Sequence, residues 1–331
     1  MQRWLAEAID AAALRLQARS AQLSRRTIWP DAEELQALQQ GTWEPPPLTD
    51  PGSPSDVARI LLARGPSEAD EGFWFASSPP YAQEHDRSVQ GLLYLPTGEA
   101  RGVVILAPGA FTGAGGRLTD RIYPQIARAF GAVGFAAARL MLPLHERRTP
   151  PGEISGHNLL HGDVFTYARG ICQGVRDVRA TIGWLRSEFE TVGYWGLSLG
   201  AGIGSLVAAR DSRLAFAILL EPPLRAEAAL RSPLTREWRE QLSASGVGEA
   251  DLNSVLRALE PQGPPAIPPG QILLQGGRWD RLASPKGIRQ LAERWGGPDL
   301  RWYNDGHISM LMGRRRWLRD AVEFAAMSTG A

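Results

Sequence analysis

From about residue 89 to the end, the chain alternates short apolar runs with longer segments of helical periodicity. Several of the short runs are apolar at every position, which is typical of strands that helices cover on both faces. This alternation predicts an α/β fold with a mostly parallel sheet. The predicted strands are Val89–Leu95, Gly102–Ala107, Val133–Ala138, Thr191–Trp195, Leu214–Leu220 and Gln271–Gln275. The predicted helices are Leu118–Phe130, Phe165–Phe189, Leu199–Arg210, Pro285–Trp295 and Ile308–Ala326.

The first 28 residues have a different pattern, with apolar residues at helical spacing between several arginines. A basic amphipathic helix of this kind can lie on a membrane surface, but more often its apolar stripe packs on its own domain. A proline-rich connector, Glu44–Pro54, follows. We therefore expect residues 1–85 to be an N-terminal extension that wraps an α/β domain of residues 86–331. The apolar stripe consists of Leu5, Ile9, Leu16 and Leu23.

Two longer segments interrupt the alternation, and each follows a predicted strand. Residues 139–162 contain Arg147 and three of the five histidines, and residues 222–269 contain a predicted helix around Thr235–Leu242. In open α/β sheets, ligands bind beyond the carboxyl ends of the strands. The two segments are therefore predicted to be a pocket loop and a small cap or lid.

Composition narrows the class of function. The 36 basic and 35 acidic residues nearly balance, which gives no support to nucleic-acid binding. Cys172 is the single cysteine, so no intrachain disulfide can form, and it is predicted to be a buried apolar residue of a helix. No apolar run is long enough to span a bilayer, and charged residues interrupt the N-terminal apolar runs that a signal peptide would need. The expected localisation is cytoplasmic.

The segment Gly196–Gly200 has the pattern G-x-S-x-G, with Ser198 at its centre. It joins a predicted strand to a predicted helix, which is the context of a nucleophile elbow. Such a turn holds the serine in a strained conformation, and side chains two residues away would collide with it. Ser198 is therefore the predicted nucleophile.

A serine hydroxyl needs an adjacent base to act as a nucleophile near neutral pH. His307 is the only histidine after Ser198 and lies in a predicted turn between the apolar segment Leu300–Tyr303 and the last helix. We predict that His307 is the base. The earlier histidines of the pocket loop, which are less suited to this role, are His145, His157 and His161.

The acid that orients the histidine is expected between the serine and the histidine in the chain. Asp280 follows the predicted strand Gln271–Gln275 and is the preferred residue, because a carboxylate there can hold the imidazole tautomer. Glu221, at the end of the preceding strand, is the alternative acid. Asp305 is too close to His307 in sequence to reach its ring from behind.

An oxyanion hole should combine the amide of the residue after the serine with one from the loop after an earlier strand. The predicted donors are Leu199 and Ala110, with Phe111 as the alternative to Ala110. The glycines near residue 113 lack the spacing of a phosphate-binding loop.

From about residue 89 onward, the order of these elements resembles the α/β-hydrolase superfamily. The elbow Trp195–Gly200, the long helix before it and the segment Gly306–Ser309 resemble a little-characterised abhydrolase-domain-containing group. Pro108-Gly109 departs from the common His-Gly motif of the oxyanion loop. The resemblance implies the hydrolase fold and the roles of nucleophile, acid and base for Ser198, Asp280 and His307.

The predicted activity is that of a serine hydrolase, most simply an esterase or lipase-like enzyme, which uses no metal or organic cofactor. A pocket lined by Phe111, Met141 and Arg147, with Arg139 and Arg148 nearby, would suit a small-molecule or lipid-like acyl ester that carries an anionic group. An amidase or peptidase, a thioesterase or an acyltransferase could use the same three residues. A non-catalytic binding protein with the same fold is the alternative from another class.

Overall fold

The computed structural model describes residues 2–23, 30–62, 69–113, 117–223 and 236–329. Within these residues nine strands form one sheet, in the order β1-β2-β3-β5-β4-β6-β7-β8-β9. The first four strands in this order pair antiparallel, and the strands from β5 to β9 pair parallel. The strands are β1 (Ala58–Leu61), β2 (Glu71–Ala76), β3 (Ser88–Tyr94), β4 (Gly102–Ala107), β5 (Phe135–Met141), β6 (Val192–Leu197), β7 (Phe216–Leu220), β8 (Ile272–Gly277) and β9 (Asp299–Tyr303).

The predicted α/β class and the mostly parallel sheet are confirmed. Each of the six predicted strands is present, with ends that differ from the prediction by three residues or fewer. Strand β9 was predicted only as the apolar segment Leu300–Tyr303. Strands β1 and β2 were not predicted, and β1 is only four residues long and largely exposed. Both lie within residues 1–85, so the sheet begins inside the segment that we expected to be an extension.

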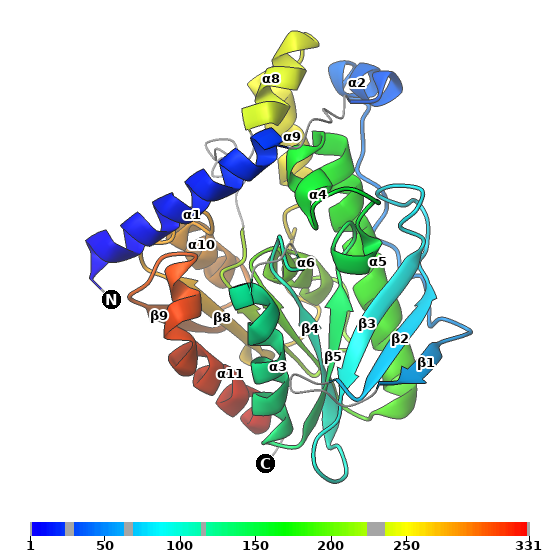
Figure 1. Ribbon diagram of the computed structural model, residues 1–331, viewed down its shortest axis with the longest axis vertical. Coiled ribbons are helices and arrows are strands. Elements are labelled where there is room, and N and C mark those ends of the chain that lie inside the picture. Colours follow the sequence, from blue (N-terminus) through cyan, green and yellow to red (C-terminus); the bar gives the residue numbers. More distant parts are fainter. Residues whose placement is uncertain (1, 24–29, 63–68, 114–116, 224–235, 330–331) are drawn as a thin grey trace.

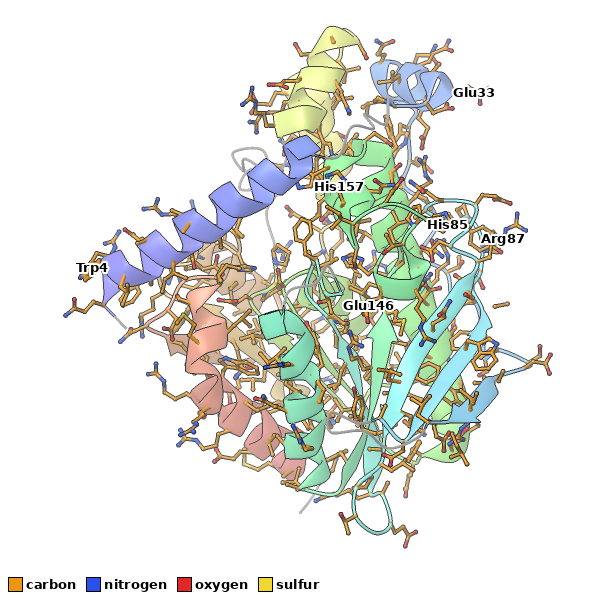
Figure 2. The ribbon with its side chains drawn as sticks, in the orientation of Figure 1. Trp4, Glu33, His85, Arg87, Glu146 and His157 are labelled. Atoms are coloured by element: carbon orange, nitrogen blue, oxygen red, sulfur yellow. The ribbon has the colours of Figure 1, made fainter. Side chains whose placement is uncertain are left out.

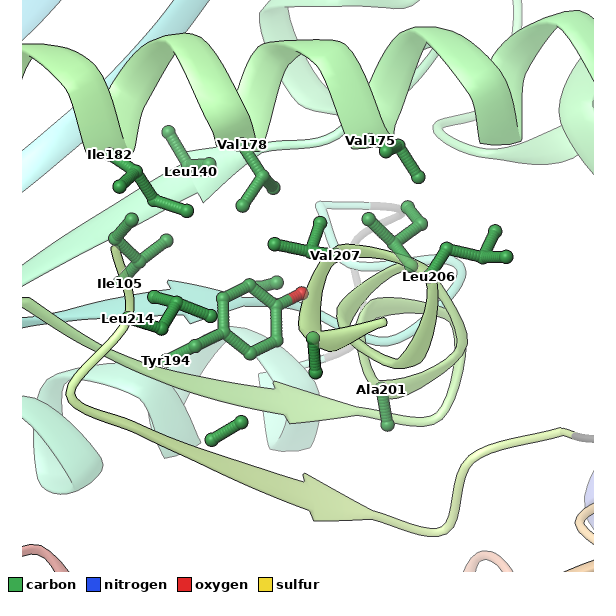
Figure 3. Packing of buried hydrophobic residues seen from close by; sticks show 14 of the residues in the cluster. Ile105, Leu140, Val175, Val178, Ile182, Tyr194, Ala201, Leu206, Val207 and Leu214 are labelled. Carbon is green, nitrogen blue, oxygen red and sulfur yellow. The ribbon is translucent and has the colours of Figure 1, made fainter. Parts of the chain in front are cut away.

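Helices cover both faces of the sheet, and alternate residues of each strand point to opposite layers. Val103 and Ile105 of β4 belong to the core beneath α5, α6 and α10, whereas Val104 and Leu106 belong to the core beneath α3 and α11. Figure 3 shows α5 side chains packed over Ile105 and Tyr194. The helices are α3 (Arg117–Gly131), α5 (Val164–Glu188), α6 (Leu199–Ala208), α10 (Pro285–Arg294) and α11 (Arg314–Ser328).

A small helical layer lies at the N-terminal end of α5, on the side of the sheet where the parallel strands end (Figure 1). Its apolar core combines Leu38 of α2 with Trp238 of α8, Val255 of α9 and Phe165 of α5. Helices α8 and α9 belong to the predicted cap, of which residues 224–235 lie outside the described residues. The helices are α2 (Ala32–Gln39), α4 (His157–His161), α8 (Arg236–Ala244) and α9 (Glu249–Ala258).

The predicted N-terminal helix is α1 (Arg3–Leu23), which crosses above the ends of β8 and β9 (Figure 1). Its buried residues include Ala6 and Asp10, whereas Trp4 points outward and is 65% exposed (Figure 2). Leu5, from the predicted apolar stripe, is also exposed. The buried polar residue Asp10, and not Leu5, therefore anchors this end of the helix. The side chains of Leu16 and Leu23 lie outside the described residues.

No helix in the described part of the chain combines the length and the apolar character that crossing a membrane requires. The predicted contact of α1 with a membrane surface stays a prediction.

Candidate active site

Ser198 lies at the sharp turn between β6 and α6, with φ 49° and ψ −112°. A non-glycine residue with this backbone conformation is strained and persists only where its surroundings hold it. Gly196 and Gly200 allow that turn to close. A Cβ atom on Gly200 would lie 2.1 Å from the carbonyl oxygen of Ala107, and one on Gly196 would lie 2.6 Å from the carbonyl carbon of Gly200. These glycines are therefore required by close backbone contacts.

Three side chains that the sequence predicted to act together form one hydrogen-bonded chain. Oγ of Ser198 lies 2.8 Å from Nε2 of His307, and Nδ1 of His307 lies 2.7 Å from Oδ2 of Asp280. Asp280 follows β8 and His307 follows β9, so the ends of adjacent parallel strands bring them together. The second oxygen of Asp280 accepts hydrogen bonds from the amides of Leu282 and Ala283, which fixes the carboxylate.

The imidazole of His307 is 7% exposed. Burial opposes its charged form, but the carboxylate of Asp280, through its charge and hydrogen bond, more than offsets this effect. The pKa of His307 therefore lies above its usual value. An imidazole in this environment can accept a proton readily and is stabilised once it carries one.

Glu221, the alternative acid, lies beside this chain but does not form the hydrogen bond to His307. Its Oε2 is 3.7 Å from Nδ1 of His307, beyond hydrogen-bond distance. Burial and the neighbouring carboxylate of Asp280 raise the pKa of Glu221 well above its usual value. Glu221 also has a positive φ of 55°. The geometry thus favours Asp280 as the partner of the imidazole, and burial favours the neutral form of Glu221.

Glu221, Asp280 and His307 are also close enough to act as metal ligands, since one ligand atom from each lies within 4.8 Å of the others. Carboxylate and imidazole groups are ligands that zinc accepts. However, Nδ1 of His307 is already bonded to Asp280 while Nε2 faces Ser198. The hydrogen-bonded chain explains this cluster of side chains without an ion.

Asp10 of α1 reaches the loop that carries His307, a contact that sequence reasoning missed. Its carboxylate accepts hydrogen bonds from the amides of His307 at 2.6 Å, Ile308 at 2.9 Å and Ser309 at 3.3 Å. Burial raises the pKa of Asp10, although these three amides favour its charged form. No local pattern connects residues 297 positions apart, so the sequence carried no signal for this contact.

The loop after β4 lies directly against the turn at Ser198. The Gly200 amide donates to the carbonyl of Pro108 at 3.0 Å, and the Gly109 amide donates to the hydroxyl of Tyr123 at 2.9 Å. Phe111 has a positive φ of 61°, which turns the chain back after Ala110. Among the described residues, the predicted donors Leu199 and Ala110 have no acceptor for their amides. Both amides therefore remain candidates for binding an oxyanion.

The predicted pocket residues have different environments. Met141 is 6% exposed, Phe111 is half-buried, and Arg147 is exposed. The Phe111 ring lies 6.0 Å from the ring of His161. Burial lowers the pKa of His161 to about 4, so this ring is neutral.

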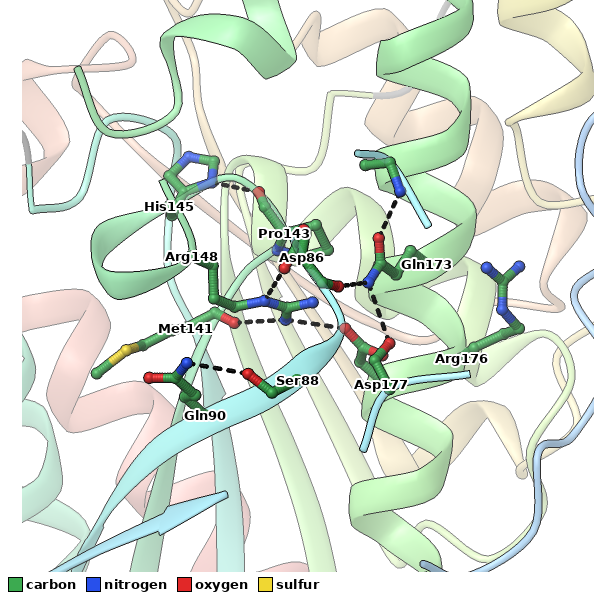
Figure 4. A network of polar contacts seen from close by, with 12 residues as sticks. Asp86, Ser88, Gln90, Met141, Pro143, His145, Arg148, Gln173, Arg176 and Asp177 are labelled. Carbon is green, nitrogen blue, oxygen red and sulfur yellow. Dashed lines mark hydrogen bonds and ion pairs between the residues drawn. The ribbon is translucent and has the colours of Figure 1, made fainter. Parts of the chain in front are cut away.

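Two arginines that we expected near a free pocket wall are held by carboxylates instead. Arg148 is buried and pairs with Asp86 and Asp177, 2.9 Å from the latter (Figure 4). Arg139 pairs with Glu146 at 2.7 Å. A buried guanidinium needs such partners, because an unpaired charge inside a protein is costly. The expectation that Arg139 and Arg148 recognise an anionic substrate was therefore wrong.

The prediction for Cys172 is confirmed. Its side chain is fully buried in α5, and burial raises the pKa of its thiol to about 12. A thiol in this environment stays protonated and is a poor nucleophile.

No protein-family model matches the chain. Two uncharacterized proteins of Mycobacterium tuberculosis, MT2702 of strain CDC 1551 / Oshkosh and Rv2627c of strain ATCC 25618 / H37Rv, are each 33% identical to it over 194 residues. The matched region covers 55% of this chain and 45% of each relative. The chain thus spans about half the length of the curated relatives that it matches.

Solved structures with a similar fold include acetyl xylan esterase 1 from Thermoanaerobacterium sp. JW/SL YS485, with a TM-score of 0.57 and 14% identity over 90% of this chain and 95% of the esterase. A lipase in its open form has a TM-score of 0.52 and 15% identity over 74% of this chain and 96% of the lipase. An α/β hydrolase from Penicillium sp. sh18, GrgF, has a TM-score of 0.52 and 14% identity over 83% of this chain and all of that protein. The sheet order, the covering helices and these similarities together show that the chain has the α/β-hydrolase fold.

Proposed function

We propose that the protein is a serine hydrolase that cleaves a carboxylic ester through an acyl-enzyme intermediate. The observation that carries this proposal is the 2.8 Å distance between Oγ of Ser198 and Nε2 of His307, at a strained turn between a strand and a helix. The bond from His307 to Asp280 completes the geometry of a nucleophile, a base and an orienting acid. The structural similarity to an esterase and a lipase supports the same class of activity.

In the first step of the proposed reaction, His307 takes the proton of the Ser198 hydroxyl as Oγ attacks the carbonyl carbon of the ester. The carbonyl oxygen becomes negative, and the amides of Leu199 and Ala110 donate hydrogen bonds to it. Asp280 stabilises the imidazolium that forms. His307 then gives its proton to the leaving alcohol oxygen as the ester C–O bond breaks, which leaves the acyl group on Ser198.

In the second step, a water molecule loses a proton to His307 and attacks the acyl carbon. The second tetrahedral intermediate uses the same amide donors, and collapse returns the proton to Oγ of Ser198 while the carboxylic acid leaves. Both steps need an imidazole that starts neutral and gains a proton. The position of Asp280 on the far side of the ring suits this cycle.

For the substrate, we propose a small-molecule or lipid-like acyl ester. Phe111 is a half-buried apolar residue of the predicted oxyanion loop, Met141 is buried at the end of β5, and Arg147 is the exposed cation of the pocket loop. Recognition of an anionic group on the substrate would therefore depend on Arg147. A panel of acyl esters with and without an acidic head group tests this: wild type should prefer the acidic esters, and Arg147→Ala should remove the preference. An equal rate for both classes in wild type contradicts it.

Labelling with a fluorophosphonate probe tests the nucleophile directly, because the probe reacts covalently with activated serines. Wild type should be labelled, and both Ser198→Ala and His307→Ala should lose the label. Ser205→Ala is a matched control, since Ser205 lies on α6 and its hydroxyl donates to the carbonyl of Gly202 at 2.6 Å. Labelling that persists in Ser198→Ala contradicts the proposed nucleophile. Ester, thioester and amide substrates with the same acyl group then distinguish the leaving groups.

A further inference from the structure

The loop that carries His307 is held from outside by a side chain of the N-terminal helix. Asp10 accepts hydrogen bonds from three successive amides, those of His307, Ile308 and Ser309. Asp10 is 4% exposed, so water does not compete strongly for its carboxylate. Hydrogen bonds between an ionised carboxylate and amides are among the stronger ones in proteins. This carboxylate therefore fixes the backbone at the residue that faces Ser198.

Gly306 makes room for the contact. A Cβ atom on Gly306 would lie 2.2 Å from Oδ2 of Asp10, closer than any tolerated approach. The Gly306 amide itself donates to the hydroxyl of Ser309 at 2.8 Å, so the loop does not rely on Asp10 to satisfy that group. The carboxylate of Asp10 thus occupies the space that a side chain at position 306 would need, and the contact depends on glycine there.

The same helix also reaches the loop that carries Asp280. Glu7, one turn before Asp10, pairs with Arg281 at 3.3 Å, and Arg281 directly follows Asp280 in the chain. Arg281 is 68% exposed, so this pair contributes little to stability. Asp10 therefore carries the contact between helix α1 and the proposed site, and the exposed Glu7–Arg281 pair does not.

We propose that Asp10 is a positioning residue for His307, and that helix α1 therefore contributes to the active site through Asp10. The inference rests on the proposed function of Ser198 and His307 as nucleophile and base. Asp10 does not touch the reacting atoms. It holds the backbone of His307 so that the imidazole meets Oγ of Ser198, and misplacement of a reacting group by about 1 Å can lower a rate by about 10²-fold.

The test measures the maximal rate of fluorophosphonate labelling and the probe concentration at half that rate. Asp10→Ala should lower the maximal rate by roughly 10²-fold with little change in the half-saturating concentration, because the loss concerns the base and not the binding of the probe. Asp10→Asn, which keeps one acceptor oxygen of the same shape, should recover part of the rate. Glu7→Gln is the matched control on the same helix and should label like wild type.

A double substitution separates positioning from a general loss of stability. Gly306→Ala alone should lower the labelling rate, because its Cβ collides with Asp10. In the Asp10→Ala background the same substitution should add little, since the carboxylate is gone. Additive losses, or an Asp10→Ala rate equal to that of Glu7→Gln, overturn the inference. If Asp10→Ala does not fold, Asp10→Asn is compared with Glu7→Gln, and a rate equal to the control overturns the inference.

The proposed function fails in a different way. Absence of labelling at Ser198 in the wild-type protein contradicts the nucleophile itself, whatever the Asp10 variants do. Labelling of wild type with equal maximal rates in all Asp10 variants keeps the nucleophile and removes the role of Asp10.

Discussion

Oε2 of Glu221 lies 3.7 Å from Nδ1 of His307, so the imidazole has a second carboxyl group beside it that is too far away to accept its proton in a hydrogen bond. The pKa of Glu221 is raised well above its usual value by burial and by the charge of Asp280. Two neighbouring carboxyl groups cannot both be ionised easily, so the neutral form of Glu221 is favoured beside the Asp280–His307 pair.

The first prediction concerns these two acids. Asp280→Asn should lower turnover of an ester substrate by about 10⁴-fold, because an amide neither holds the correct imidazole tautomer nor stabilises the imidazolium. Glu221→Gln should lower turnover by less than about tenfold, since a glutamine has the size and charge of a protonated glutamate. Steady-state kinetics of both variants make the comparison. A larger loss for Glu221→Gln would exchange the roles of the two residues.

The second prediction concerns pH. His307 must be neutral to act as a base, and its pKa is raised above the usual value by Asp280 despite burial. The labelling rate at Ser198 should therefore fall as the pH falls through the pKa of His307, with a midpoint above the ordinary histidine value of about 6.5. Measuring the rate from pH 5 to 9 gives the midpoint. A midpoint below the ordinary histidine value contradicts the proposed influence of Asp280.

The third prediction concerns the glycines of α6. Gly200→Ala should destabilise the protein by about 1–3 kcal/mol and reduce labelling, because its Cβ would overlap the carbonyl oxygen of Ala107. Gly202→Ala, two residues later in the same helix, meets only the side chain of Pro223 at 3.4 Å. It should leave labelling intact and raise stability by up to about 1 kcal/mol. Chemical denaturation and labelling of both variants check this, and equal losses would argue against the close approach at Gly200.

The fourth prediction concerns the arginines of the pocket loop. Arg148→Leu should cost about 3–5 kcal/mol of stability, because it leaves Asp86 and Asp177 buried without their cation. The neighbouring residue Arg147 is exposed, and Arg147→Leu should change stability by less than about 0.5 kcal/mol. Denaturant titrations of the two variants measure the difference. Similar stabilities would mean that the Arg148 ion pairs contribute little.

The sequence was sufficient for the parts of this structure that strong local patterns specify. The run Gly102–Ala107, which is apolar at every position, is a strand with the predicted bounds. The turn at Ser198 needed only its glycines and its place between a strand and a helix. His307 and Asp280 followed from the order of elements, because adjacent parallel strands end at the same edge.

The sequence could not indicate contacts between residues that are far apart in the chain. Asp10 looked like an ordinary charged residue of an amphipathic helix, and its role depends on amides 297 or more positions away. Arg148 looked like a pocket cation, and only the fold brings Asp86 and Asp177 to it. Strand β1 is short and mostly exposed, so its own residues give little indication of a strand, and its pairing with β2 stabilises it.

The contact between α1 and the His307 loop also bears on how the protein matures during synthesis. The ribosome makes Asp10 before the amides that bind it, the first of which follows 297 residues later. At a synthesis rate of about 5–20 residues per second, the amides of the His307 loop are made roughly 15–60 seconds after Asp10. During that interval the sheet up to β8 can form, while the serine lacks its base. The hydrolase proposed here would therefore reach its full activity only when helix α1 and the loop after β9 have met.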